Sequence, residues 1–287
     1  MMETTQDGPF IPLAQPGVDV ERLDFVMCNP PFYSSPSEMA SSASAKSKPP
    51  NSACTGSPSE MVLPGGEIAF ISRIISESLR LREKVQWYTS MVGKLSSLIP
   101  LIELLKAEGC TNWAVTELVQ GTKTRRWVVG WSWRGWRPGL DVARGVGAGT
   151  LERKYLPFPS EYCVMVNAQD VKEAGRKLNE ALKVLKMYWV WDVAKVEGIG
   201  FSEGDVWSRS ARRKMKVTAA TEEKSAPEME MKFGVKITVK NVDGGTEFLV
   251  RWLKGDDSVL FESFCGMVKR TVEGAPKTKR KTDKITS

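Results

Sequence analysis

The feature that most constrains the fold is the stretch DFVMCNPPFYSS, which begins at residue 24. An almost uninterrupted apolar run, LDFVMC at residues 23–28, stops at Asn29 and two consecutive prolines. A strand without regular polar alternation is typical of an α/β sheet that is covered on both faces. Proline lacks an N–H and fixes φ, so Pro30 and Pro31 end such a strand rigidly. The sequence therefore predicts a short, fully buried strand.

Composition excludes several classes of chemistry. The chain has 287 residues, a net charge of +7 and no histidine. A basic balance favours an anionic partner, nucleic acid first. Without histidine there is no histidine triad, histidine general base or histidine zinc ligand. The five cysteines are scattered and form no C-x-x-C pair, so we expect neither a disulfide framework nor a metal site.

Targeting signals are also missing from the sequence pattern. No stretch reaches the roughly 18 apolar residues of a membrane span. Residues 1–16 lack the basic start and apolar core of a signal peptide. We expect no membrane partner and a reducing compartment, nucleus or cytoplasm. The oligomeric state is not indicated by any pattern.

The first half of the chain alternates strands and helices. Residues 34–65 are rich in Ser, Pro, Ala, Gly and Lys, and we expect a mobile loop there. Elsewhere the patterns predict a helix over 67–83, a strand over 86–93, a helix over 100–108 with Pro100 in its first turn and Gly109 at its end, and strands over 113–119 and 126–133 joined as a hairpin.

The second half predicts a small α+β module. Residues 135–158 are rich in Gly and Arg at their start and are expected to be a linker. The module spans 159–270, with an insertion at 202–232 that we expect to be disordered and a basic tail at 271–287. Its elements are strands over 161–167 and 187–196, helices over 170–186 and 258–270, and a hairpin of 233–241 with 247–254 around Asp243-Gly244-Gly245.

Asn-Pro-Pro-Phe can bind a planar amino group. The Asn29 side-chain carbonyl and the next backbone carbonyl can accept the two N–H bonds of an amine, which directs its lone pair towards a methyl donor. The prolines make this geometry rigid, so little conformational entropy is lost on binding. Phe32 offers a face on which a flipped base can stack. The position, after a buried strand, is where open α/β sheets bind ligands. The other interpretation is that two prolines merely end a strand.

This motif resembles motif IV of the Rossmann-like amino-methyltransferases, which adenine-N(6), guanine-N(2) and glutamine methyltransferases share. Three blocks in order, DFVMCNPPF, GGEIAFISRIISESLRLREKVQWYTSMVGKLSSL and TELVQGTKTRRWVVGWSW, resemble the U6 small nuclear RNA adenine-N(6) methyltransferase family. The resemblance covers residues 24–133. It implies the C-terminal half of a Rossmann-like sheet over residues 1–134 and S-adenosylmethionine as methyl donor. It also implies RNA as substrate, a nuclear location, and target-adenine contacts from Asn29, Pro30, Pro31 and Phe32.

The methyl-donor site is the departure from the family. The resemblance places that site upstream of the motif, on three strands with a Gly-rich turn and an acidic residue. Only 23 residues precede Asp24, and they contain no such turn. We therefore expect the donor site upstream of Met1, in a fragment or a mis-started gene model. Donor binding by this chain alone is not expected. The rival hypothesis is a non-catalytic RNA-binding protein derived from the enzyme.

Basic and aromatic residues give further candidates. Lys123, Arg125 and Arg126 lie between two expected strands, where they form either a phosphate-contacting surface or a hairpin without function. Trp131 and Trp133 are expected in the core. Gly65-Gly66-Glu67 fits a helix start better than a phosphate cradle. The basic run at residues 209–216 could be a nuclear signal or an RNA patch. The module itself weakly resembles the family's RNA-binding C-terminal region.

Overall fold

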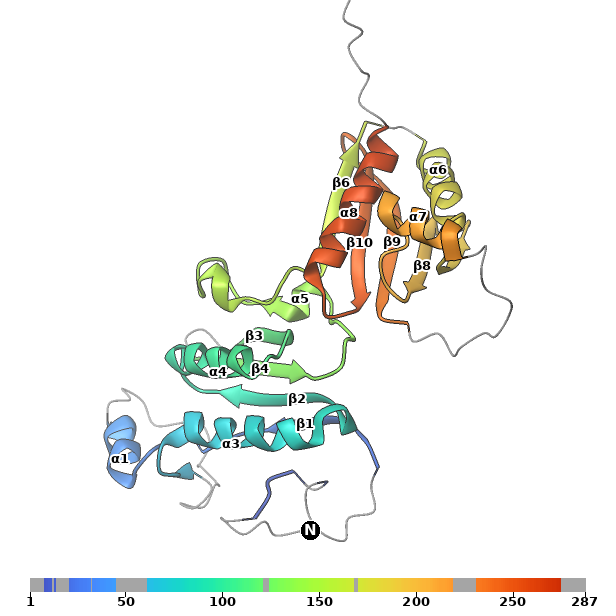
Figure 1. Ribbon diagram of the computed structural model, residues 1–287. Helices are drawn as coiled ribbons and strands as arrows, with labels where there is room; N and C mark the ends of the chain where they lie inside the picture. The colour runs from blue at the N-terminus through green and yellow to red at the C-terminus, as the bar shows by residue number, and fades with distance from the viewer. Residues whose placement is uncertain are drawn as a thin grey trace, which may run out of the picture. The chain divides into compact units, whose positions relative to one another are not determined.

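The computed structural model describes residues 8–11, 13, 21–31, 33–44, 61–120, 124–167, 170–218 and 231–274. The chain divides into two compact units, Met1–Ser160 and Glu161–Ser287, and each contains one five-stranded sheet (Figure 1). Within the described ranges, no helix is long and apolar enough to cross a membrane. Each unit is described below by itself.

The sheet of the first unit is mixed. Its strands are β1 (Leu23–Cys28), β2 (Val85–Val92), β3 (Asn112–Gln120), β4 (Thr124–Ser132) and the short β5 (Arg144–Gly145), in the order β1-β2-β4-β3-β5. β1 and β2 are parallel, and β4 runs antiparallel to both β2 and β3. The prediction that residues 24–28 and 86–93 share a sheet is confirmed. β3 and β4 form a hairpin, and its second strand, β4, lies next to β2, with β3 beyond it.

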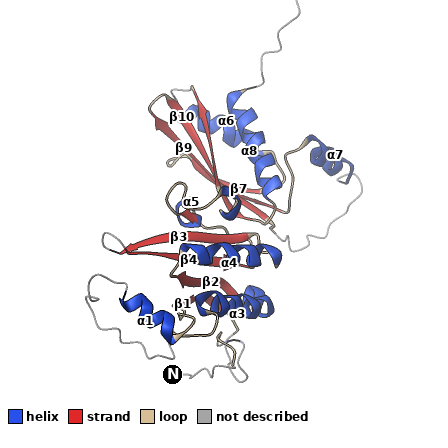
Figure 2. Cartoon of the chain, turned by 90° about the vertical axis from the view of Figure 1, so that its left-hand side faces the viewer, coloured by secondary structure: helices blue, strands red, loops and turns tan. Residues whose placement is uncertain are grey.

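Two helices cover one face of this sheet. α3 (Gly66–Leu81) and α4 (Leu95–Ala107) lie side by side on it, as Figures 1 and 2 show. Their apolar residues pack on fully buried sheet residues such as Tyr88, Val115 and Trp131. The expectation that the second helix begins at Pro100 is wrong, because Pro100 lies inside α4. The end is as expected, since Gly109 follows with a left-handed φ of 78°.

β1 corrects the first expectation. The strand exists and ends at Cys28, but it is an edge strand and is not fully buried. Phe25 and Met27 are 65% and 81% exposed. Val26 and Cys28, on the opposite side of the pleat, pack against the core. The apolar pattern correctly predicted a strand, but only one of its faces is covered by the described residues.

Two segments expected to be irregular contain regular structure. Within residues 34–65, α1 (Pro36–Ser44) is helical, and residues 45–60 lie outside the described ranges. Residues 135–158, where we expect a linker, pack on the first unit. They form α5 (Leu140–Ala143), β5 and η3 (Arg153–Tyr155), and Leu151 and Tyr155 join the core. The Trp113 indole N–H donates to the carbonyl oxygen of Tyr155 at 3.1 Å, which fastens this segment.

The second unit is an antiparallel sheet with helices. Its elements are β6 (Glu161–Val166), α6 (Val171–Lys183), β7 (Tyr188–Asp192), β8 (Glu197–Ser202), α7 (Arg209–Thr218), β9 (Phe233–Val242), β10 (Gly245–Lys254) and α8 (Ser258–Glu273), and the strand order is β6-β10-β9-β8-β7. The expected hairpin is present, with Gly244 at a φ of 96° in its turn. The core contains Trp252, Phe248, Phe261 and Phe264.

β8 and α7 were not predicted. β8 reads EGIGFS, and its glycines hide the strand pattern. They are required by packing, since a Cβ at Gly198 would lie 2.3 Å from the Trp189 ring. α7 occupies part of the segment 202–232 that we expected to be disordered. Before α7, Ser202 belongs to β8, and Val206 and Trp207 are buried, so the expectation of disorder is wrong there as well. Residues 219–230 and the basic tail from residue 275 lie outside the described ranges.

Candidate functional site

Asn29 lies at the carboxyl end of a parallel strand pair. Cys28, the last residue of β1, is opposite Ser90 of β2, so both strands end at the same edge of the sheet. The Thr89 hydroxyl donates to the carbonyl oxygen of Val26 at 2.8 Å and ties the two strands together just before this edge. Asn29 is exposed, whereas Pro30 and Pro31 are buried. The prolines therefore anchor the turn and leave the amide of Asn29 accessible. Phe32 lies outside the described residues.

The chain after the motif is closed into a loop. The Tyr33 N–H donates to the carbonyl oxygen of Met61 at 3.1 Å, and the Leu63 N–H donates to that of Tyr33 at 3.0 Å. These bonds pair Tyr33 with Val62 in a short parallel bridge. The two ends of the Ser-rich segment therefore meet beside the motif.

α1 begins with a variant of the capping box, in which the carboxylate of Glu38 accepts from the residue before the N-cap Ser35. The Glu38 N–H donates to the Ser35 hydroxyl at 3.2 Å, and the Glu38 carboxylate accepts from the Ser34 N–H at 2.8 Å. Pro36 occupies the first helical position, which suits its fixed φ. The sequence S-P-S-E at residues 35–38 contains this signal, because a serine followed three residues later by a glutamate is typical of a helix start. The compositional argument for a loop missed it.

A buried carboxylate fixes the turn after β2. Glu67, only 4% exposed, accepts from the backbone N–H groups of Gly93 at 2.6 Å and Lys94 at 3.1 Å. Gly65 and Gly66 have left-handed φ values of 82° and 60°, which let α3 start where Glu67 reaches this turn. The choice of a helix start over a phosphate cradle is therefore correct. The N–H groups of Gly93 and Lys94 are bonded to Glu67, so neither is open to a ligand.

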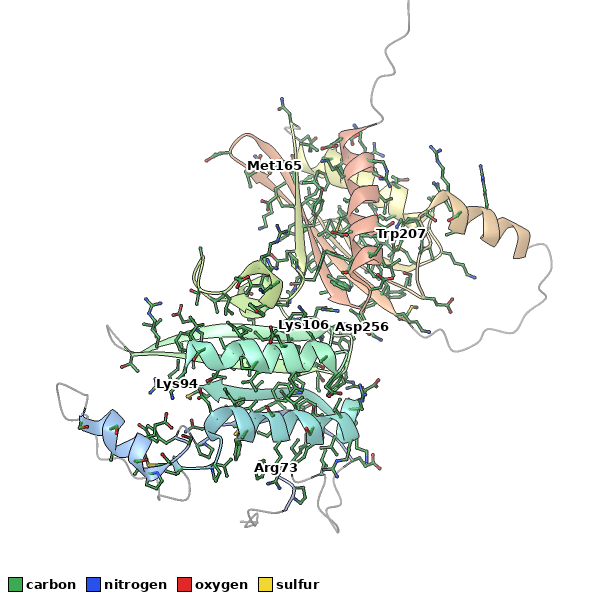
Figure 3. The ribbon with its side chains drawn as sticks, turned by 60° about the vertical axis from the view of Figure 1, so that its left-hand side comes forward. Arg73, Lys94, Lys106, Met165, Trp207 and Asp256 are labelled. Atoms are coloured by element: carbon green, nitrogen blue, oxygen red, sulfur yellow. The ribbon has the colours of Figure 1, made fainter. Side chains whose placement is uncertain are left out.

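Lys94 and Glu38 form an ion pair at the same edge. Their Nζ and Oε1 atoms are 2.7 Å apart, and Figure 3 shows Lys94 at the end of the sheet nearest α1. The Lys94 ammonium, followed by the Ser34 donors, lowers the pKa of Glu38 to about 2. The bond to Glu38 raises the pKa of Lys94 in turn. Both groups are therefore charged at neutral pH. Neither was selected from the sequence, although Lys94 directly follows a strand end.

The β3–β4 hairpin brings basic residues to this edge. β3 points in the same direction as β2, so its end and the start of β4 lie where β1 and β2 end, as Figure 2 shows. Only β2 separates β1 from β4, so these strands lie about 10 Å apart. Arg125 is exposed and bonds the largely buried Glu117 at 2.6 Å, which offsets part of its charge. Arg126, beside it, is half-buried, and Lys123 lies outside the described residues.

Tryptophans on β4 and after it are structural. Trp131 is fully buried and stacks on Tyr88, with ring centroids 5.6 Å apart, so its assignment to the core is confirmed. Trp133 is partly buried against the same core. Both indole N–H groups donate to the Ser78 hydroxyl at 3.0 Å. Among the described tryptophans of this unit, Trp136 is the most open, at 42% exposed.

The residues at this edge do not fit the methyl donor by themselves. β1 is followed by Asn-Pro-Pro, and the N–H groups after β2 are occupied by Glu67. Among the described residues there is thus no Gly-rich turn at this edge with free N–H groups for a donor. We assign no residue of this chain to donor binding.

Taken together, the parallel pair, the helix between its strands, the inserted hairpin and the exposed Asn29 before two buried prolines define a class. The first unit has a mixed, Rossmann-like sheet, and Asn29, Pro30 and Pro31 lie at the carboxyl edge of its parallel strand pair, where open α/β sheets bind ligands. Residues 17–135 match the model of an RNA methyltransferase family. This segment therefore resembles that family in sequence.

Individual relatives agree with this assignment. The chain is 31% identical over 253 residues to the U6 small nuclear RNA (adenine-(43)-N(6))-methyltransferase of Schizosaccharomyces pombe, covering 88% of this chain and 61% of the relative. It is 42% identical over 111 residues to the human RNA N(6)-adenosine-methyltransferase METTL16, covering 38% of this chain and 20% of the relative. The chain thus spans about three fifths of the first relative and about a fifth of the second.

Solved structures show a partial likeness as well. A crystal structure of the hMettl16 catalytic domain in complex with a MAT2A 3′UTR hairpin is 37% identical, with 42% of each chain covered and a TM-score of 0.37. That score is too low to support a statement about shape.

Proposed function

We propose that this chain is part of an S-adenosylmethionine-dependent RNA adenine-N(6) methyltransferase, with U6 small nuclear RNA as the leading substrate. The single observation that carries the proposal is the exposed Asn29 held in front of two buried prolines at the carboxyl edge of a parallel strand pair. The match of residues 17–135 to an RNA methyltransferase family and the similarity to the U6 small nuclear RNA methyltransferase of Schizosaccharomyces pombe support the substrate class.

Asn29 binds the target amine in this proposal. Its side-chain carbonyl accepts one N–H of the adenine amino group, and the neighbouring backbone carbonyl accepts the other. The nitrogen lone pair is then directed out of the base plane, and no general base is required before the bond to carbon forms. The donor supplies an electrophilic methyl group when bound. Phe32 provides the stacking face for the flipped base.

The basic hairpin holds the RNA backbone. Arg125 and Arg126 lie at the start of β4, at the edge that presents Asn29, and Lys123 precedes β4 in the sequence. Arginine suits phosphate because its planar group can donate two parallel hydrogen bonds. Arg125 shares its charge with Glu117, which offsets part of its contribution. Such contacts supply affinity and orientation, and the base pocket supplies selectivity.

The proposal extends to domain roles and location. Residues 1–134 act as the partial methyltransferase domain, and residues 159–270 as an appended module. The donor is S-adenosylmethionine, bound by residues other than those described here. U6 small nuclear RNA as a substrate places the protein in the nucleus. A metal ion or a membrane has no role in this chemistry.

A second candidate function is a non-catalytic RNA-binding protein. The bonded N–H groups of Gly93 and Lys94, which leave no donor cradle among the described residues of this edge, favour it. Titration of the chain with S-adenosylmethionine separates the two functions. Measurable donor affinity supports the enzyme, and its absence together with tight RNA binding supports the second candidate. Product analysis would identify a guanine-N(2) or glutamine methyltransferase instead.

The decisive variant is Asn29→Ala, in a form of the protein that transfers methyl groups. Losing one preorganised acceptor should lower kcat about 100-fold, or about 3 kcal/mol of barrier, by analogy with other active sites. RNA affinity should stay within about twofold, because it arises mainly from phosphate contacts. Asn29→Asp, which keeps an acceptor oxygen in place, should retain more activity than Asn29→Ala. Weaker RNA binding with unchanged kcat would mean that the motif only ends a strand.

A further inference from the structure

We propose that Glu38 and Lys94 form a latch that RNA opens: Lys94 is a phosphate-binding residue at the target edge, and Glu38 occupies it in the free protein. This inference rests on the proposed RNA substrate. It assigns a role to two residues that lie outside the Asn-Pro-Pro-Phe motif and outside the basic hairpin. The name latch refers below to this ion pair and to the α1 segment that it holds.

The position of Lys94 is fixed by its backbone. Its N–H is held by the buried carboxylate of Glu67 at 3.1 Å, and it is the residue that precedes α4. β2 ends two residues earlier, so Lys94 lies at the carboxyl edge, next to the strand that presents Asn29. Its side chain is 59% exposed. A fixed main chain with an exposed ammonium group at this edge is suited to an anion that lies along it.

Glu38 is placed to compete for that ammonium group. Its carboxylate accepts from the Ser34 N–H at 2.8 Å, from the Ser34 hydroxyl at 2.6 Å and from the Lys94 ammonium at 2.7 Å. The first two bonds are local to the start of α1, and within the described part of the chain the bond to Lys94 is the one that joins Glu38 to another element. That single bond ties α1 to the end of β2 (Figure 3). An exposed ion pair of this kind is weak and readily exchanged.

Phosphate is the natural competitor. A lysine ammonium group binds the charge of a backbone phosphate at least as well as a carboxylate, and neighbouring Arg125 and Arg126 would hold adjacent phosphates on the same edge. When RNA replaces Glu38, α1 loses its bond to β2 while keeping its own capping bonds. The segment can then move from the motif without unfolding. The pKa of Glu38, about 2, means that the latch stays charged at neutral pH and that RNA rather than pH opens it.

The test is a double-mutant cycle on the full chain, with a fluorescently labelled RNA hairpin that carries an unpaired adenine as the probe. Lys94→Gln should weaken binding about threefold to tenfold and lower the slope of log K against log salt by about 1. Glu38→Gln should strengthen binding about twofold to fivefold, because it removes the competitor. In the Lys94→Gln background, Glu38→Gln should have no further effect.

The chain offers a matched control pair. Glu83 and Lys84 are exposed residues of η2 (Arg82–Lys84), which precedes β2 and therefore lies at the opposite edge of the sheet. Glu83→Gln and Lys84→Gln make the same charge changes there, and each should alter affinity by less than about twofold. Hydrogen exchange at Tyr33 and Leu63 should stay slow in Glu38→Gln, which verifies that the loop base remains closed.

Each other outcome overturns the proposal in an identifiable way. If Glu38→Gln weakens RNA binding, Glu38 organises the site and does not mask it. If Glu38→Gln strengthens binding equally with and without Lys94, the substitution acts only by removing a negative charge near the RNA, and no latch exists. If the unmodified chain does not bind the hairpin at all, the proposed RNA function fails together with the latch.

Discussion

The open faces of the two sheets have different chemistry. On the first sheet, exposed Phe25 and Met27 of β1 lie beside the half-buried Trp87 and Thr89 of β2, so the surface is largely apolar. On the second sheet, neighbouring strands are joined by ion pairs, Lys236 with Glu197 at 2.8 Å and Lys240 with Glu247 at 3.8 Å; exposed apolar residues lie among them. The second face is therefore mixed, with charged and apolar side chains, whereas the first is largely apolar and suited to an apolar cover.

The difference follows from strand direction. A parallel pair requires a crossover, and crossovers place helices on sheet faces, so strands in parallel sheets are apolar on both sides. β1 is such a strand, and one of its faces packs against the core of the first unit. The second sheet is wholly antiparallel, and its strands alternate between a covered and a solvated face. β1, an edge strand, thus has the sequence that is typical of a strand buried on both faces.

The largest effect is expected in the closed core of the second sheet. Trp252 is fully buried, stacks on Phe261 with centroids 5.1 Å apart, and donates its indole N–H to the carbonyl oxygen of Lys254 at 2.8 Å. Trp252→Ala should lower the free energy of unfolding by about 3–5 kcal/mol, measured by urea denaturation. Trp136→Ala, at a 42% exposed site, is the control and should cost less than about 1 kcal/mol. Equal costs would contradict the packing described here.

In the first unit, a single hydroxyl organises the core under the sheet. Ser78 of α3 is fully buried, accepts from the indoles of Trp131 and Trp133, and donates to the carbonyl oxygen of Ile75 at 2.7 Å. Ser78→Ala leaves two N–H groups without this acceptor and should cost about 2 kcal/mol in the same assay. Ser76→Ala, exposed on the same helix, should change stability by under about 0.5 kcal/mol. A neutral Ser78→Ala would show that both indoles find other acceptors.

Helix starts give a smaller contrast between the units. Asp257 begins α8 by accepting from the N–H groups of Val259 at 2.9 Å and Leu260 at 3.1 Å, whereas α3 and α4 have no side-chain cap. Asp257→Ala should therefore cost about 1 kcal/mol of stability. Asp257→Asn retains an acceptor and should lose only a fraction of that, as thermal unfolding can measure. A full loss in Asp257→Asn would assign the effect to charge at the helix start instead.

The parts of the fold that the sequence predicted have strong local signals. The stop at Pro30-Pro31, the hairpin turn at Asp243-Gly244-Gly245 and Gly109 after α4 each restrict the backbone directly. Features that depend on distant residues were missed. The glycines of β8 are explained only by the rings of Trp189 and Trp191 lying over them. The burial of β1 could not be predicted from its own sequence, because burial depends on which other segments pack against the strand.

The candidate site shows the same division. Asn29 was found because a rare tetrapeptide follows a strand, and Arg125 and Arg126 because basic residues interrupt a β-rich run. Glu67, Glu117 and Lys94 were missed. A glutamate at the start of a helix or within a strand has no distinctive pattern, and its partner lies 8 to 27 residues away in the chain. The S-P-S-E sequence at the start of α1 is different, because it could have predicted a helix there.

The smallest effect tests the comparison of the two faces most directly. Phe25 and Val26 are consecutive in β1 and point to opposite faces, so they are matched in strand position. Phe25 is 65% exposed, and Val26 packs against the core. Phe25→Ala should change the free energy of unfolding of this chain by less than about 0.5 kcal/mol, while Val26→Ala should cost about 1–2 kcal/mol. If Phe25→Ala costs about 3 kcal/mol or more, the range for a buried phenylalanine, then the apolar face of the first sheet is covered in solution, and the contrast between the two sheets disappears.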